Sequence, residues 1–368
     1  MRKTGILTIS ILVISILVNI NAGNIASAQE TQTLVITEIG QLNTSGFAAS
    51  IHVKDGVAIV ADSDSGLCII DVSDPENPTE LSRFDEGIDH IHELYVDEDL
   101  AYIADYTEGF KVINISDSIN PTQVGLCHDG GEVGTFDIYE DLAFIADFED
   151  GLEIVNISDP TDPTEIYQYN TGISYIFNVE INNDLAYVSD FISATQKSLI
   201  VLNISDLSNI QELAEFPIDG EVFSIDFVGD IAYMMCSYGG VKVFNISNPL
   251  SLTEIYSHND GGHSVDLEFY NDYAFIADRE EGLEILDIND LSNVTEVGNY
   301  YDGGSASGIA IVDELIYVAD GEDGLEILQI GNAQTTGVFD LALFAALSGS
   351  VALVGLVILI VWRKVKER

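Results

Sequence analysis

The feature that most constrains this chain is a sequence unit of about 42 residues that occurs seven times. Each unit carries an Ala-Asp step, an acidic residue before glycine, an apolar run ending in Asn-Ile-Ser-Asp-Pro, and a closing Pro-Thr-Glu, with variations. Successive units lie 42 to 46 residues apart when they are aligned on the last residue of the first step, which is Asp62, Asp105, Asp147, Asp190, Cys236, Asp278 and Asp320. Repetition at this period indicates stacked structural units of one architecture.

Each unit contains four short apolar or alternating segments bounded by turn residues. In the third unit they are residues 135–139, 142–146, 152–157 and 164–169, rich in Ile, Tyr, Phe and Val. Such runs are typical of strands, and nothing between them has helical periodicity. Four strands in about 42 residues indicate a propeller blade. We therefore predict an all-β, seven-bladed β-propeller of four-stranded blades over residues 29–331.

The two ends of the array complement each other. The last unit stops near residue 330 and lacks the fourth strand that closes every other unit, whereas residues 33–40 (TLVITEIG) form a strand-like segment without a unit. We predict that this N-terminal strand is the outer strand of the seventh blade. Such closure leaves no blade exposed as the edge of an open stack.

The termini predict export and membrane attachment. Residues 1–28 have Arg2 and Lys3, an apolar stretch and a small-residue site ending at Ala28, as in a signal peptide; an uncleaved anchor is the alternative. After a linker (332–340), residues 341–362 are uncharged and as a helix would extend about 33 Å, enough to span a bilayer core of about 30 Å. The basic tail (363–368) places the C-terminus in the cytoplasm. The alternative is a processed C-terminal sorting signal.

The charge is strongly one-sided. Of the 62 acidic residues 61 lie between residues 29 and 340, against six of the 12 basic residues, so this region carries about −55. Such a field repels nucleic acid and attracts cations. Cys68, Cys127 and Cys236 are widely spaced and odd in number, which indicates neither a disulfide framework nor a thiolate metal site.

The repeated apolar runs resemble a known family. The segments GLCIIDVSDP (66–75), GLEIVNISDP (151–160) and GLEILDINDL (282–291) are similar to the LVIVD repeats of bacterial and archaeal surface proteins. The resemblance covers roughly residues 33–331. It implies an exported, surface-located protein with a propeller-like fold, and it brings no catalytic motif. The fourth unit departs from the pattern at residues 191–198 and the fifth at residues 236–240.

Five hairpins between second and third strands carry paired acids, and in a propeller these hairpins share one face with the loops between blades. Clustered carboxylates are ligands for Ca²⁺, so this face is a candidate cation surface. The alternative is a solvated acidic coat, since the hairpins lack an EF-hand pattern. The candidate ligands are Asp62, Asp64, Asp105, Glu108, Asp147, Asp150, Asp278, Glu281, Asp320 and Asp323.

The fourth and fifth units lack the acidic hairpin, which leaves a gap in the ring of negative charge. Lys197 and Tyr238 lie in this gap, next to Met234, Met235 and Cys236. We interpret the gap as a docking patch for a surface protein or glycan, with Lys197 and Tyr238 as contacts. The alternative is drift of the repeat together with buried strand residues.

The first strands of the units place one residue each at an equivalent position. Four consecutive units offer a carboxylate there, which predicts either a second cation site in the axial channel or hydrogen bonds to neighbouring backbone or water. The residues are His52, Tyr95, Asp137, Glu180, Asp226, Glu268 and Ala310.

Six Asn-x-Ser/Thr sequons are candidate glycosylation sites. Four of them, Asn114, Asn156, Asn203 and Asn245, share a repeat position at which other units have Asp, so turn formation explains them. Asn43 and Asn293 lie off this position and are the predicted glycosylation sites.

No familiar catalytic motif occurs in the sequence: it has no Gly-x-Ser-x-Gly elbow, no His-Glu-x-x-His and no phosphate-binding glycine loop. We therefore expect a non-enzymatic binding or adhesion module at the cell surface, for surface proteins or glycans, with Ca²⁺ as the candidate cofactor. The alternative function is an extracellular polysaccharide hydrolase or lyase that uses carboxylates on the loop face.

Overall fold

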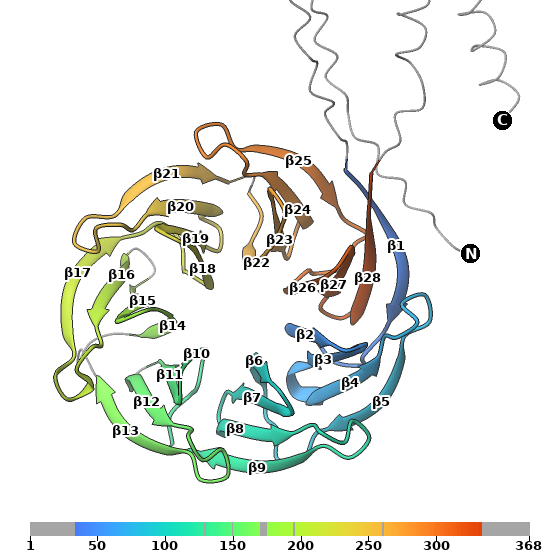
Figure 1. Cartoon of the computed structure of the whole chain (residues 1–368), viewed down its shortest axis with the longest axis horizontal. Coiled ribbons are helices and arrows are strands. Elements are labelled where there is room, and N and C mark those ends of the chain that lie inside the picture. The colour runs from blue at the N-terminus through green and yellow to red at the C-terminus, as the bar shows by residue number, and fades with distance from the viewer. Residues whose placement is uncertain are drawn as a thin grey trace, which may run out of the picture. The chain divides into compact units, whose positions relative to one another are not determined.

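The computed structural model describes residues 34–332 except 129, 149, 170–174, 194–195 and 260. In this part of the chain, 28 strands form seven four-stranded antiparallel sheets around a common axis (Figure 1). Helical structure among the described residues is limited to two 3-10 turns, η1 (Ser63–Ser65) and η2 (Leu207–Asn209). The predicted seven-bladed propeller is confirmed.

In blades 1 to 6 the strands follow the chain from the axis outward (Figure 1). Blades 1 to 3 are β2 (Ser50–Lys54), β3 (Val57–Ala61), β4 (Leu67–Asp71) and β5 (Thr79–Phe84); β6 (Ile91–Asp97), β7 (Leu100–Asp105), β8 (Gly109–Asn114) and β9 (Thr122–Cys127); β10 (Phe136–Tyr139), β11 (Leu142–Asp147), β12 (Gly151–Asn156) and β13 (Thr164–Tyr169). Blades 4 and 5 are β14 (Ile176–Asn182), β15 (Leu185–Ser193), β16 (Gln196–Asn203) and β17 (Gln211–Pro217); β18 (Ser224–Val228), β19 (Ile231–Met235), β20 (Val241–Asn245) and β21 (Thr253–His258). Blade 6 is β22 (Ser264–Tyr270), β23 (Tyr273–Asp278), β24 (Gly282–Asp287) and β25 (Thr295–Tyr300).

Blade 7 is built from both ends of the propeller. It contains β26 (Gly308–Val312), β27 (Leu315–Ala319) and β28 (Leu325–Asn332), and its outer strand is β1 (Leu34–Leu42) (Figure 1). The predicted closure by the N-terminal strand is therefore confirmed, with the strand running two residues beyond the predicted end. Packing closes the ring as well, since one buried cluster joins Val60 and Ile70 of blade 1 to Tyr317 and Ile327 of blade 7.

The second and third strands of each blade are covered on both faces by neighbouring blades. In β11 every residue after Leu142 is buried, and in β12 every residue before Asn156 is buried. This double coverage explains why these strands are continuous apolar runs, whereas outer strands such as β5, β9 and β13 are mostly exposed or half-buried. The core is accordingly a series of clusters between adjacent sheets, and the three cysteines are free thiols.

The repeated Asn and Asp residues after the third strands form turns. The side-chain oxygens of Asn114, Asn156, Asn203 and Asn245 each accept a backbone hydrogen bond from the Ser two residues further on, at 2.9 to 3.0 Å. The predicted turn role is confirmed. The predicted glycosylation sites Asn43 and Asn293 are both exposed, although the Asn43 amide donates a hydrogen bond to the Glu322 carbonyl at 2.9 Å.

The segments predicted to direct export and anchoring, residues 1–28 and 341–368, lie outside the described residues, as does the linker from residue 333 onward. Within the described ranges, no helix is long and apolar enough to cross a membrane.

Candidate functional site

The first acid of each hairpin is buried, so its carboxylate is not part of the solvent-exposed surface. Asp62, Asp105, Asp147, Asp278 and Asp320 are at most 3 % exposed. The carboxylate of Asp105 accepts backbone hydrogen bonds from Asp89 and His90 at 3.0 and 2.9 Å, and that of Asp278 accepts one from His263 at 2.7 Å. These carboxylates therefore fasten the loop between two blades, which is why the Ala-Asp step recurs.

The buried acids are neutralised differently from blade to blade. Arg83 pairs with Asp62 at 2.6 Å in blade 1. In blade 2 the ammonium of Lys111, itself 2 % exposed, contacts Asp105. Six residues after the Asp, where blade 2 has this lysine, blades 3, 6 and 7 have glutamate: Glu153, Glu284 and Glu326.

The second acid of each predicted pair is exposed at the tip of the hairpin, namely Asp64, Glu108, Asp150, Glu281 and Asp323. Across the described residues, two groups bring three potential ligand atoms within 4.8 Å of one another: Asp302, Asp320 and Asp323; and His258, Glu284 and Glu296. Only Asp320 and Asp323, of the ten predicted Ca²⁺ ligands, belong to such a group. The other eight do not belong to such a group in the described part of the chain.

The largest set of converging polar groups lies on the propeller axis, in a cavity of about 600 Å³. The inner strands supply its wall, and Asp137, Glu180, Asp226 and Glu268 line it, as predicted from their equivalent positions. Two further carboxylates, Glu93 and Asp266, line it as well. Six acidic side chains from five blades therefore line one cavity.

Burial shifts these axial carboxyl groups toward their protonated forms. It raises the pKa of Glu93 and of Glu268 to about 7 and that of Asp266 to about 6. Burial, with the nearby Asp266 and Glu268, raises the pKa of Asp226 to about 8. The pKa of Glu180 is well above its usual range, chiefly through burial and then through Asp137, to which it is hydrogen-bonded. At neutral pH the cavity therefore presents both hydrogen-bond donors and acceptors.

Some axial carboxylates also connect neighbouring inner strands. Asp137 accepts the backbone N–H of Ile181 at 2.7 Å, and Asp266 accepts that of Ile309 at 2.8 Å. The predicted alternative, hydrogen bonding to neighbouring backbone, is thus confirmed for Asp137. Asp266, which was not predicted, makes the same kind of bond. Asp137 and Asp266 make these backbone hydrogen bonds and also line the cavity.

A chain of aromatic rings lies across the loop-face side of the cavity. We call it the aromatic arc; successive ring centroids lie 4.7 to 5.9 Å apart, and its members are His92, Tyr106, Phe148, Phe177, Phe223 and His263. His92, Phe148, Phe177 and Phe223 line the cavity itself. The arc extends over blades 2 to 6 and gives the acidic cavity an apolar rim.

Arg279 is the one cationic side chain among the residues that line the cavity. Its guanidinium lies 5.5 Å from the Phe223 ring centroid, and its buried Nε has no hydrogen-bond partner among the described residues. Burial lowers its pKa. Burial also lowers the pKa of His92 to about 4, with His90 and Arg279 contributing, so His92 is neutral at neutral pH.

The aromatic arc was not predicted. Tyr106 and Phe148, like Arg279, directly follow the Ala-Asp step, a position that the repeat leaves variable. A position that varies within an otherwise regular repeat is a sequence signal for a binding residue. His92 and Phe177 reach the rim because the inner strands are irregular between Ile91 and Glu93 and between Ile176 and Asn178. Such bulges redirect a side chain, and the sequence gives no sign of them.

The predicted docking patch needs correction. Met234, Met235 and Cys236 are fully buried in the cores between blades, so they offer no surface to a partner. Tyr238 is 61 % exposed, and its ring stacks on His263 at 4.6 Å, which extends the aromatic arc outward. Lys197 pairs with Glu221 at 3.2 Å and lies 5.4 Å from the Phe191 ring centroid.

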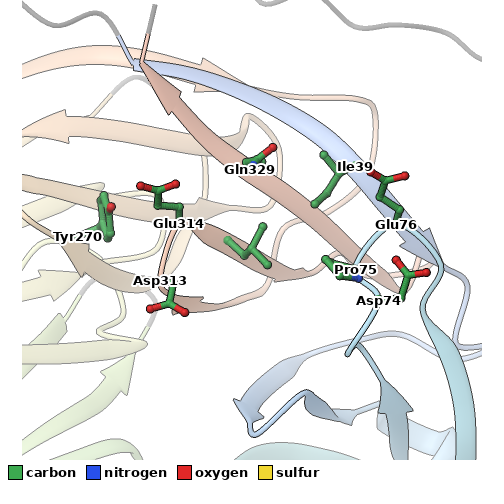
Figure 2. Close-up of a pocket in the computed structure, with 9 residues that line it drawn as sticks. Ile39, Asp74, Pro75, Glu76, Tyr270, Asp313, Glu314 and Gln329 are labelled. Carbon is green, nitrogen blue, oxygen red and sulfur yellow. The ribbon is translucent and has the colours of Figure 1, made fainter.

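A second hollow, of about 700 Å³, is lined by residues of blades 1, 6 and 7 and by β1 (Figure 2). Its acidic side chains come from turns: Asp74 and Glu76 from blade 1, and Asp313 and Glu314 from blade 7. The Asp74 carboxylate accepts a hydrogen bond from the side-chain amide of Asn77 at 3.0 Å. The axial cavity, where polar groups converge from five blades, is therefore the candidate site.

Comparison with solved structures finds the same architecture at low identity. The computationally designed Ika8 protein is 10 % identical, with a TM-score of 0.58 over 79 % of this chain and 99 % of that chain. The β-propeller domain of Cps50 (Swd1) from Myceliophteria thermophila is 12 % identical, with a TM-score of 0.65 over 80 % of this chain and 100 % of that chain. At such identity the likeness shows the fold alone. No curated protein matches the chain.

The LVIVD repeat model matches residues 45–86, 90–129, 130–171, 176–216, 261–302 and 303–334, more than half of the chain. The stretch left out between residues 216 and 261 contains all four strands of blade 5, where residues 236–240 replace the acidic hairpin. The chain therefore belongs to the LVIVD repeat family.

Proposed function

We propose that this protein is a surface-anchored binding or adhesion module that holds a glycan or a surface protein on the loop face of the propeller. The observation that carries the proposal is the axial cavity, which combines an aromatic rim with converging carboxyl groups and Arg279. Concave sites with aromatic walls and few oriented polar groups are typical binding sites. Export and anchoring of the propeller are part of the proposal and depend on segments 1–28 and 341–362.

A glycan suits the cavity better than a flat protein surface does. The faces of Phe148, Phe177 and Phe223 can pack against the apolar face of a sugar ring. The carboxyl groups and Arg279 can exchange hydrogen bonds with hydroxyl groups. A protein partner would instead meet the exposed ring of Tyr238 outside the cavity.

Binding is tested with the full-length protein on immobilised glycans, with and without a chelator. We expect Phe177→Ala and Phe223→Ala to weaken retention by about tenfold or more, the effect of losing a buried aromatic anchor. Tyr139→Ala is the control, because Tyr139 is an exposed aromatic residue at the β10–β11 turn, outside the cavity. Retention that is equal in all four proteins, at equal thermal stability, would rule out the cavity as the site.

The alternative function, a polysaccharide hydrolase or lyase, is favoured by the raised pKa values of Asp226 and Glu268, since perturbed carboxyl groups in a cavity are candidate acids. Against it, Asp137 and Glu180 hydrogen-bond directly to each other, whereas glycosidase carboxyl pairs stand about 5 Å or more apart. Mass analysis of any retained glycan separates the two functions. Products that disappear in Asp226→Asn would establish the enzyme.

A further inference from the structure

One acidic cluster on the loop face holds a buried carboxylate oxygen for which the described residues provide neither an ion pair nor a hydrogen bond. One carboxylate oxygen each of Asp302, Asp320 and Asp323 lies within 4.8 Å of the other two. Asp302 comes from the loop between blades 6 and 7, Asp320 from the end of the second strand of blade 7, and Asp323 from the hairpin that follows. Three carboxylates at this separation repel one another unless a cation or protons lie between them.

The Asp320 side chain is 3 % exposed, and its Oδ2 is fully buried without a hydrogen-bond partner among the described residues. The carboxylate accepts a backbone hydrogen bond from Ser305, and the loop backbone lies so close that a Cβ at Gly304 would overlap it. A small cavity of about 10 Å³ is lined by Asp302, Asp320 and Glu326. That is room for about one small ion or water.

Blade 2 shows how the same position is satisfied elsewhere in the ring. Three and six residues after Asp105 come Glu108 and Lys111, and the Lys111 ammonium contacts the buried Asp105 carboxylate. Three and six residues after Asp320 come Asp323 and Glu326. Glu326 accepts a hydrogen bond from the Tyr300 hydroxyl at 2.7 Å and brings a further acid where blade 2 has its cation.

We propose that blade 7 binds one Ca²⁺ ion through Asp302, Asp320 and Asp323, at the place where blade 2 uses the Lys111 ammonium. The donors are all carboxylate oxygens, the ligands that hard divalent ions select, and no nitrogen or sulfur ligand belongs to the group. Asp302 and Asp323 are exposed, so water can complete the six to eight ligands that Ca²⁺ takes. Mg²⁺ fits less well because it demands near-ideal octahedral geometry.

The ion would fasten the loop between blades 6 and 7 to the hairpin of blade 7, the blade that closes the ring. This inference deepens the cation dependence of the proposed binding function, but the site itself needs no partner.

The experiment titrates Ca²⁺ into the full-length protein at pH 7.5 and fixed ionic strength, without any glycan. It records the unfolding midpoint and the tyrosine-sensitised luminescence of Tb³⁺, because Tyr300 and Tyr301 line the small cavity. Asp302→Asn and Asp323→Asn remove one ligand each at an exposed position. Glu108→Gln is the matched control: it removes the same charge at the equivalent hairpin position of blade 2.

We expect Ca²⁺ to raise the midpoint of the wild type and of Glu108→Gln, and to displace Tb³⁺ from both. In Asp302→Asn and Asp323→Asn the Ca²⁺ concentration required should be about tenfold higher or more, since affinity follows the number of charged ligands. An equal Ca²⁺ response in all four proteins would mean general charge screening and would overturn the site. A larger rise with Mg²⁺ would overturn the assignment to Ca²⁺. Because no partner is present, neither result depends on the proposed glycan binding.

Discussion

Closure of the ring by β1 can be tested with a single pair of neighbouring residues. Ile36 and Val35 are adjacent β-branched residues in the same strand, and their side chains point to opposite faces because successive residues alternate. Ile36 is 2 % exposed, whereas Val35 is 36 % exposed. The two substitutions Ile36→Ala and Val35→Ala therefore remove similar groups from the same backbone and differ in the packing that is lost.

The expected magnitudes follow from these exposures. Truncating a buried Ile to Ala removes its transfer free energy and leaves a cavity, which costs about 2 to 5 kcal/mol. A substitution on an exposed face usually costs within about 0.5 kcal/mol. We therefore expect Ile36→Ala to lower the free energy of unfolding by about 2 to 5 kcal/mol and Val35→Ala by about 0.5 kcal/mol or less.

Chemical denaturation followed by circular dichroism measures both variants, with an unchanged denaturant slope as the sign that only stability changed. Such a loss is a sizeable part of the 5 to 15 kcal/mol that stabilises a typical domain. If both substitutions lower the free energy of unfolding equally, or if Ile36→Ala lowers it by less than about 0.5 kcal/mol, β1 does not hold the ring together.

Two further predictions concern charge. The axial carboxyl groups have raised pKa values in the folded state, so the folded protein binds more protons than the unfolded chain. Its stability should therefore fall as the pH rises from about 4 to about 8, and the fall should be smaller in Asp226→Asn. Thermal unfolding across that pH range measures this, and stability that rises with pH would contradict the prediction. Lys111→Met leaves the Asp105 carboxylate buried without its cation and should cost about 3 to 5 kcal/mol, whereas Lys242→Met in blade 5, where Cys236 replaces the Asp, should cost much less in the same denaturation assay.

The repeat itself made the fold predictable. Seven units, four strands per unit and the missing strand at the end follow from counting Ala-Asp steps and turns, and the structure has the same seven sheets. Local roles were readable where a side chain bonds within its own turn, as Asn156 does. The acidic character of the axis could also be predicted from the sequence. In each blade the inner-strand acid pairs with the equivalent residue of the second strand; these acids are Asp137, Glu180, Asp226 and Glu268.

What could not be predicted depends on contacts between blades. We predicted the acid of the Ala-Asp step to be a surface ligand. In the structure Asp105 and Asp278 are buried, and each binds the backbone of an interblade loop that lies 15 residues earlier in the chain. Met234 and Met235, which we interpreted as part of a docking patch, belong to the core. Neighbouring blades cover both faces of their strand, and the sequence of one repeat does not show this coverage. His92 and Phe177 reach the rim through strand irregularities, which are set by the local backbone.

The sharing of blade 7 between the two ends of the propeller has a consequence for biosynthesis. β1 is made first, yet its partner β28 begins only at Leu325, so nearly 300 residues must be translated before the two can pair. At about 5 to 20 residues per second, that wait is roughly 15 to 60 s. During it, the free edge of β1 is open to a strand of another nascent chain. A strand exchanged between two copies at this stage would yield an intertwined dimer in which each ring is completed by its neighbour.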